Sequence, residues 1–150
     1  MIFWKIIGQI AFWLTWPGIR LSLRFTTRTR ALITHGNNVL VVKPWLGNGK
    51  WSLPGGGIKT NEDTLTALIR EVKEETAIML RRMDCSKKGN FEYKSSGLRF
   101  LYSLYVVKLP TVPSVERQKS EISTIDWIDK QQLNKGNANS DVLHAINIGE

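Results

Sequence analysis

Apolar and polar residues alternate with two different periods along this chain of 150 residues, and these periods predict its strands and helices. Strand-like alternation or short apolar runs predict strands at 19–26, 30–34, 39–42, 50–53, 91–95, 98–107 and 121–128. Apolar residues at helical spacing predict helices at 62–77 and 141–148. The first of these helices is expected to be capped by Thr60 or Asn61, with Asp63 in a capping-box position. Turn residues at 35–38 and 96–97 predict two hairpins, and the proline-containing stretch 108–120 is expected to be a loop.

The first 18 residues have a different pattern from the rest of the chain. They are mostly apolar, and their few polar residues fall near one side at helical spacing, so the pattern predicts a helix with a narrow polar edge. Three readings of this helix stay open: it packs on its own domain, it lies on a membrane surface with its tryptophans at headgroup level, or it spans the membrane. The expected organisation is therefore an N-terminal helix at 1–18 and one domain at 19–150.

Charge is distributed unevenly. The chain has 21 basic and 13 acidic residues, a net charge of +8, and the first carboxylate is Glu62. This excess favours an anionic partner such as a phosphate compound, a nucleic acid or a lipid surface. The single cysteine, Cys85, excludes an intramolecular disulfide and a Cys-pair zinc site. A single thiol fits a reducing compartment, so the expected location is cytoplasmic, peripheral to the inner membrane face if the N-terminal helix binds lipid.

Three carboxylates share one side of the predicted helix at 62–77. Glu71, Glu74 and Glu75 stand at i, i+3 and i+4, next to the apolar stripe, so they lie at the rim of the core. Carboxylates this close repel one another unless a cation compensates, and oxygen-only ligands favour Mg²⁺ or Mn²⁺ over zinc. Taken alone, the cluster could also be the solvated face of a Glu/Lys-rich helix.

The residues around this cluster complete a longer motif. Gly56, Glu62, Arg70, Glu71, Glu74 and Glu75 match the box Gly-x5-Glu-x7-Arg-Glu-U-x-Glu-Glu-x-Gly-U, where U is aliphatic, over 56–78. Six such identities would coincide by chance only about once in 10⁷ starting positions. The chain thus resembles the Nudix hydrolase family, in its short bacterial form. One position departs from the box, because Ala77 stands where the family has a glycine that suits a left-handed helix end.

The resemblance implies a fold, an activity and a set of ligands. The implied fold is α/β, a Nudix α/β/α sandwich around a mixed β-sheet, here with an extra N-terminal apolar helix. The implied activity is Mg²⁺- or Mn²⁺-dependent cleavage of the pyrophosphate bond in a nucleoside diphosphate linked to another moiety, by water attack at phosphorus. The implied metal ligands are Glu71, Glu74, Glu75 and the carbonyl of Gly56. The expected partner is a small nucleotide derivative, with no stable nucleic-acid partner; a homodimer is allowed.

Further residues carry less specific expectations. Arg70 is expected to orient Glu71 or to pair with Glu62, which makes it part of the catalytic group. Glu121, with Glu116 as its alternative, is a candidate for the general base or a further metal ligand.

Substrate binding is assigned to Arg28, Trp51 and Tyr93, although packing in the core or at its rim is the more common role for both aromatic residues. Two competing functions remain at this point. One is a basic module that binds nucleotide, RNA or a membrane surface on a Nudix scaffold, and the other is an RNA 5′-end pyrophosphohydrolase.

Overall fold

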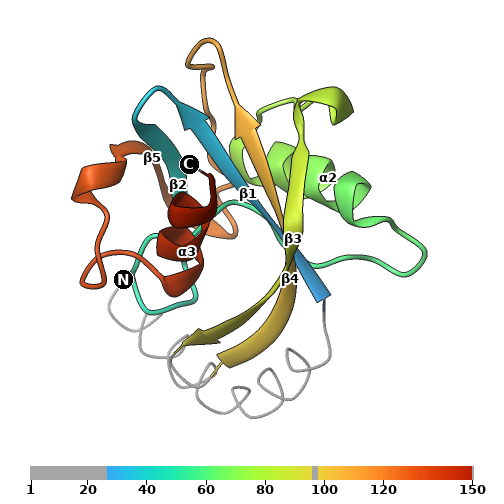
Figure 1. The fold of residues 1–150 in the computed structure, drawn as a ribbon, viewed down its shortest axis with the longest axis horizontal. Coiled ribbons are helices and arrows are strands. Elements are labelled where there is room, and N and C mark those ends of the chain that lie inside the picture. Colours follow the sequence, from blue (N-terminus) through green and yellow to red (C-terminus); the bar gives the residue numbers. More distant parts are fainter. Residues whose placement is uncertain (1–26, 96–97, 150) are drawn as a thin grey trace.

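A mixed five-stranded sheet forms the centre of the protein (Figure 1). The computed structural model describes residues 27–95 and 98–149. The strands are β1 (Thr27–His35), β2 (Asn38–Pro44), β3 (Ser86–Ser95), β4 (Leu98–Lys108) and β5 (Ile122–Asp129). Their order across the sheet is β3-β4-β1-β2-β5. β1 and β4 are parallel, and the other neighbouring pairs are antiparallel, which gives the mixed sheet that the resemblance implied.

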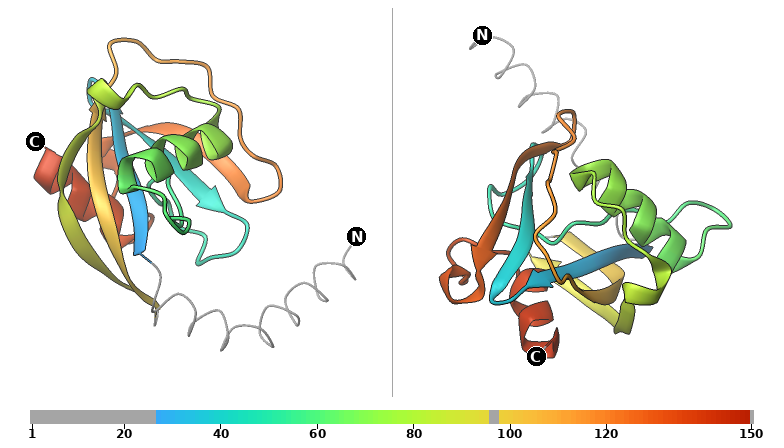
Figure 2. Two further views of the ribbon diagram at one scale, coloured as in Figure 1. Left: turned by 90° about the vertical axis from the view of Figure 1, so that its right-hand side faces the viewer. Right: turned by 90° about the horizontal axis from the view of Figure 1, so that it is seen from above.

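Two helices cover opposite faces of this sheet, α2 (Thr64–Thr76) and α3 (Ser140–Gly149) (Figure 2). Alternate residues of β1 point to the two faces, as the strand period requires. Ala31 and Ile33 pack in one core cluster with Leu68 and Val72 of α2, whereas Leu32 packs in a second cluster on the α3 side. The α/β/α arrangement is therefore confirmed. Two short 3-10 helices, Arg82–Asp84 and Lys130–Gln132, lie in the connections.

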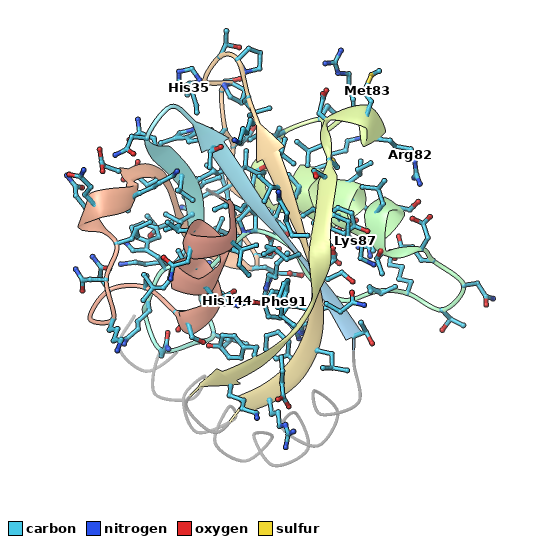
Figure 3. The ribbon with its side chains drawn as sticks, viewed as in Figure 1. His35, Arg82, Met83, Lys87, Phe91 and His144 are labelled. Carbon is cyan, nitrogen blue, oxygen red and sulfur yellow. The ribbon has the colours of Figure 1, made fainter. Side chains whose placement is uncertain are left out.

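Aromatic contacts attach α3 to the sheet. His144 of α3 lies against Phe91 of β3, with the ring centroids 4.7 Å apart and the rings nearly perpendicular (Figure 3). Nδ1 of His144 also shares a hydrogen bond of 3.2 Å with the hydroxyl of Tyr102 on β4. The helix is thus held by a polar contact as well as by its apolar residues.

Most strand boundaries differ from the predicted ones at their polar ends. β1 begins at Thr27 and not at 30, because it pairs with β4 from the Thr27–Leu101 position onward. β3 begins at Ser86 and not at 91, since antiparallel pairing with β4 extends into a polar stretch that has no strand-like pattern. The segment 50–53 forms only isolated bridges, Val42 with Ser52 and Trp51 with Ala138. The helix expected at 1–18 and the strand expected at 19–26 lie outside the described residues.

The ends of α2 correct one prediction and resolve another question. The helix is capped by Asp63, whose Oδ1 accepts hydrogen bonds of 3.0 Å from the backbone of Leu65 and Thr66, so the prediction of Thr60 or Asn61 as the cap was wrong. At the other end Ala77 itself adopts the left-handed conformation, with φ 63° and ψ 6°. The chain therefore keeps the helix end that the box glycine normally favours, with an alanine in the unfavourable backbone region.

None of the helices in the described ranges 27–95 and 98–149 is long and apolar enough to cross a membrane.

Candidate active site

The glycines before α2 bring the backbone close to both the sheet and the helix. The segment 54–57 lies beside the part of β1 that does not pair with β2. Backbone N–H groups of Ala31 and Thr29 donate to the carbonyls of Pro54 and Gly56, each at 2.9 Å. A Cβ on Gly55 would lie 2.2 Å from the carbonyl oxygen of Thr29, and Gly55 has φ +133°. Only glycine fits there, because the backbone itself is the obstacle.

Gly56 lies close to α2, where the obstacle to a larger residue is a side chain and not the backbone. A Cβ at this position would lie 2.3 Å from Oε2 of Glu71. The backbone of the box glycine is therefore packed directly against a box carboxylate, which places a carbonyl and a carboxylate in the same small region.

Arg70 links several box residues through its guanidinium group. Its Nε and Nη2 donate to the two carboxylate oxygens of Glu62, at 2.9 and 2.8 Å. Its Nη1 donates to Glu71 at 2.6 Å and lies 3.4 Å from Oε2 of Glu74, and Nη2 also donates to the carbonyl of Gly57. The hydrogen bonds from Arg70 lower the pKa of Glu62 to about 2. The contacts expected of Arg70 with Glu62 and Glu71 are both present.

Glu75 lies in a different environment from Glu74. Its side chain is buried, with 8% of its surface exposed, while that of Glu74 is 47% exposed. Oε2 of Glu75 accepts a hydrogen bond of 2.8 Å from the backbone N–H of Gly55. Burial raises the pKa of Glu75 to about 7, against the opposing effects of this hydrogen bond and of the positive charge of Arg30. A buried carboxyl group of this kind is a functional-site candidate on physical grounds.

The long loop after β4 lies against the C-terminal end of α2. The backbone N–H of Glu116 donates to the carbonyl of Thr76 at 3.0 Å, and that of Gln118 donates to the carbonyl of Glu75 at 3.2 Å. Glu121, at the end of this loop, is exposed, and its charge contributes to the raised pKa of Glu75. Both candidate bases from the sequence therefore belong to a loop that packs beside the box helix.

Arg28 lies on β1 beside the box. It forms an isolated bridge with Gly57, and its charge interacts with those of Glu71 and Glu75. Burial lowers the pKa of Arg28 to about 10, with the nearby charge of Arg30 as a second cause. Its Nε is buried and has no hydrogen-bond partner among the described residues. The structure thus places a cationic side chain next to the carboxylates with part of its hydrogen-bonding capacity unused.

Trp51 and Tyr93 lie in the core cluster on the α3 side, with 9% and 7% of their surfaces exposed. The Tyr93 ring stacks on Phe100 with centroids 4.6 Å apart, and Nζ of Lys43 lies 4.3 Å from the centre of the Trp51 ring. These surroundings account for both residues by packing, and their stacking on a base stays a prediction.

The donor atoms of the box suit a hard divalent cation. Glu71, Glu74 and Glu75 offer only oxygen, and so does the carbonyl of Gly56, which has a second lone pair beside the one that Thr29 uses. Among the described residues, the three carboxylates are not grouped closely enough to hold one metal ion together. The reason is visible in their contacts, because Glu71 and Glu74 are bonded to Arg70 and Glu75 to Gly55.

Arg30 and Asp141 form a buried ion pair close to this site, and neither was expected there from the sequence. The alternation of Arg28 and Arg30 along one strand was a usable signal for the arginine, since both side chains must share a face. A lone acidic residue at a helix start gives no such signal, because it is an ordinary feature of helix N-termini.

Comparison with known proteins places the chain in a family. The family model described as "NUDIX domain" matches residues 24–146. A curated relative, "Nudix hydrolase 10" of Arabidopsis thaliana, is 28% identical over 114 residues, which is 73% of this chain and 39% of that protein. The chain therefore spans well under half of that relative's length.

Solved structures share the fold at low identity. The MutT NUDIX hydrolase from Burkholderia pseudomallei superposes with a TM-score of 0.72 at 18% identity, covering 83% of this chain and 98% of that one. The NUDIX domain of Shewanella oneidensis NrtR, solved in complex with ADP ribose, gives a TM-score of 0.71 at 17% identity, covering 83% and 85%. Since the family model spans most of the chain, and the box lies where β1 meets α2 with Ala77 as its one departure, this chain belongs to the Nudix family.

Proposed function

We propose that this chain is a Mg²⁺- or Mn²⁺-dependent pyrophosphohydrolase that cleaves a nucleoside diphosphate linked to another moiety, by water attack at phosphorus. The observation that carries the proposal is the packing of the Gly56 backbone against the Glu71 carboxylate, on the same side of α2 as Glu74 and Glu75. Four oxygen donors of the type that Mg²⁺ prefers are thereby supplied from two short segments.

The residues of the chain then have distinct roles. Glu71, Glu74, Glu75 and the Gly56 carbonyl would hold the cation, which would stabilise the charge that develops on the phosphate oxygens. Arg70 would orient Glu71, since it donates to that carboxylate at 2.6 Å while Glu62 anchors its other side. Glu121 would accept the proton of the attacking water, because it is exposed and lies near enough to Glu75 to affect the pKa of that residue.

Arg28 would bind the phosphate oxygens of the substrate. Its guanidinium group is partly buried near Glu71 and Glu75, and its Nε has no partner among the described residues. A diphosphate would satisfy this group through charge-assisted hydrogen bonds. The structural neighbour solved with ADP ribose supports a nucleotide derivative of this kind as the substrate class.

The test is a turnover screen of nucleotide derivatives, with ADP ribose included, in Mg²⁺, in Mn²⁺ and in excess EDTA. The expected result is metal-dependent release of a nucleoside monophosphate, with ¹⁸O from labelled water found on a phosphate product. Arg28→Gln should raise the KM of the best substrate, because it removes the proposed phosphate contact. Full activity in excess EDTA would refute the metal-dependent mechanism, and ¹⁸O found outside the phosphate would refute attack at phosphorus.

The salt dependence of turnover distinguishes the proposed activity on small nucleotides from pyrophosphohydrolysis at RNA 5′ ends. Turnover of a triphosphate or capped RNA by a basic groove should fall steeply between low and moderate salt, whereas turnover of a small nucleotide should change far less. Efficient, steeply salt-dependent RNA turnover without turnover of any small nucleotide would replace the proposed substrate class.

A further inference from the structure

A buried ion pair connects the C-terminal helix to the first strand, outside the box. Nε of Arg30 on β1 lies 3.5 Å from Oδ2 of Asp141 in the first turn of α3, and their side chains are 12% and 2% exposed. Burying two charges is expensive, and an apolar pair of similar size is often at least as stable. The pair therefore calls for an explanation other than stability alone.

Both members of the pair bond to the segment that leads into the box. Nη1 of Arg30 donates to the carbonyl of Gly55 and lies 3.4 Å from the carbonyl of Leu53. Oδ1 of Asp141 accepts a hydrogen bond of 3.0 Å from the backbone N–H of Val142, and the backbone N–H of Leu53 lowers the pKa of this carboxyl against the larger, raising effect of burial. Arg30 thus binds the carbonyls of Leu53 and Gly55, with Asp141 beside it, and these contacts hold the path of the chain through 53–55.

The same glycine continues the connection to the box helix. The N–H of Gly55 donates to the buried carboxylate of Glu75 at 2.8 Å. Gly55 also lies against β1 so tightly that a Cβ would stand 2.2 Å from the carbonyl of Thr29. A small displacement of Gly55 would therefore be transmitted to the Glu75 side chain, because neither the strand nor the buried carboxylate leaves room to absorb it.

We infer that Arg30 and Asp141 are positioning residues for the box, holding Gly55 so that its N–H fixes the Glu75 carboxylate for cation binding. The inference rests on the proposed function, since it assigns these two residues to the same cation site. It extends that site to α3, which carries none of the box residues. Partners of metal-binding side chains commonly change metal affinity or activity by about 10–100-fold when they are removed.

The experiment compares Asp141→Asn and Arg30→Gln with the wild-type chain and with a control, Val142→Ala. Val142 is the neighbour of Asp141 and is fully buried in the α3 cluster, and its side chain has no polar atom that could bond to the ion pair. Its truncation should lower Tm by opening a cavity while it leaves the pair in place. Arg30→Lys is a second variant, which keeps the charge and is used if Arg30→Gln does not fold.

Two measurements that do not need catalysis decide the outcome. The first is hydrogen exchange of the Gly55 amide by NMR in the metal-free protein, and the second is the Kd of Mn²⁺ by titration. We expect Asp141→Asn and Arg30→Gln to lower the protection of Gly55 at least 10-fold and to weaken Mn²⁺ binding about 10–100-fold. With substrate, kcat should fall while KM changes little. Arg30→Lys should recover part of the loss, and Val142→Ala should keep wild-type values for both.

The inference is overturned if the charge-removing variants keep Gly55 protection and Mn²⁺ affinity within twofold of wild type. It is also overturned if Val142→Ala causes the same losses, because the effect would then be one of global stability. Failure of the proposed function has a different signature: the wild-type chain itself would bind no Mn²⁺ and turn over no nucleotide. In that case Gly55 protection still decides whether the ion pair holds this segment.

Discussion

Glu75→Gln tests whether the buried negative charge of Glu75 destabilises the metal-free fold. Glu75 is buried beside Gly55, and burial raises the pKa of its carboxyl group from 4.5 to about 7. Glutamine has nearly the same shape and can accept the same hydrogen bond from Gly55, but it carries no charge. The variant should therefore lose the ability to hold a cation and, at the same time, make the metal-free domain more stable.

The size of this gain follows from the pKa difference. Each pKa unit corresponds to about 1.36 kcal/mol, so full ionisation of Glu75 costs the metal-free fold about 3 kcal/mol. Between pH 4.5 and 7 the folded state holds a proton that the unfolded state has already lost, so the wild-type stability falls as pH rises. The advantage of Glu75→Gln should be below about 1 kcal/mol at pH 5 and reach about 3 kcal/mol at pH 8.

The assay is urea unfolding in excess EDTA at pH 5 and pH 8, with the midpoint and slope of each curve giving the free energy of unfolding. Glu74→Gln is the matched control, because Glu74 is in the same box but is 47% exposed. Its stability should stay within about 0.5 kcal/mol of wild type at both pH values. Both variants should lose metal-dependent turnover, and added Mg²⁺ should stabilise only the wild-type chain.

Three outcomes would refute the reasoning. A loss of stability in Glu75→Gln at pH 8 would show that the ionised carboxylate is well accommodated without a cation. A gain of equal size at pH 5 and pH 8 would show that ionisation is not its cause. The same gain in Glu74→Gln would show that burial does not distinguish the two glutamates.

Three other predictions concern the backbone and the N-terminal segment. Gly56→Ala should cost about 1–3 kcal/mol of stability and abolish metal-dependent turnover, because its Cβ would stand 2.3 Å from Glu71 Oε2. Gly57→Ala has open space at its Cβ and should keep wild-type stability and turnover, so equal behaviour of the two variants in turnover and Tm assays would contradict this prediction. Ala77→Gly should raise stability by about 0.5–1 kcal/mol in thermal unfolding, since glycine relieves the left-handed conformation; an unchanged or lower Tm would argue against strain at this helix end. If the helix predicted at 1–18 binds a membrane surface, the full chain should sediment with anionic liposomes, and deletion of Met1–Trp16 should abolish this binding. A full chain that stays in solution would instead favour a helix packed on its own domain.

The chemistry of the box could be predicted from the sequence because it depends on local spacing. Glu71, Glu74 and Glu75 share a side of α2 through helix geometry alone, and Arg70 reaches Glu62 and Glu71 across less than three turns. The helix itself begins and ends within two residues of the predicted limits. Its cap was predicted wrongly because Thr60, Asn61 and Asp63 are all good capping residues, and only the path of the preceding loop selects among them.

The family and the box residues could be identified from the sequence alone, and the oxygen-only side chains of the box predict a hard divalent cation, because each of these follows from residue types at short separations. The folded structure was needed to show that Glu75 is buried while Glu74 is exposed, that Trp51 and Tyr93 lie in the core, and that the loop carrying Glu121 packs beside α2. It alone also brings Arg30 and Asp141 together, 111 positions apart in the chain, at the segment before the box. Contacts at such separations depend on how strands and helices pack as a whole, and no local pattern encodes them.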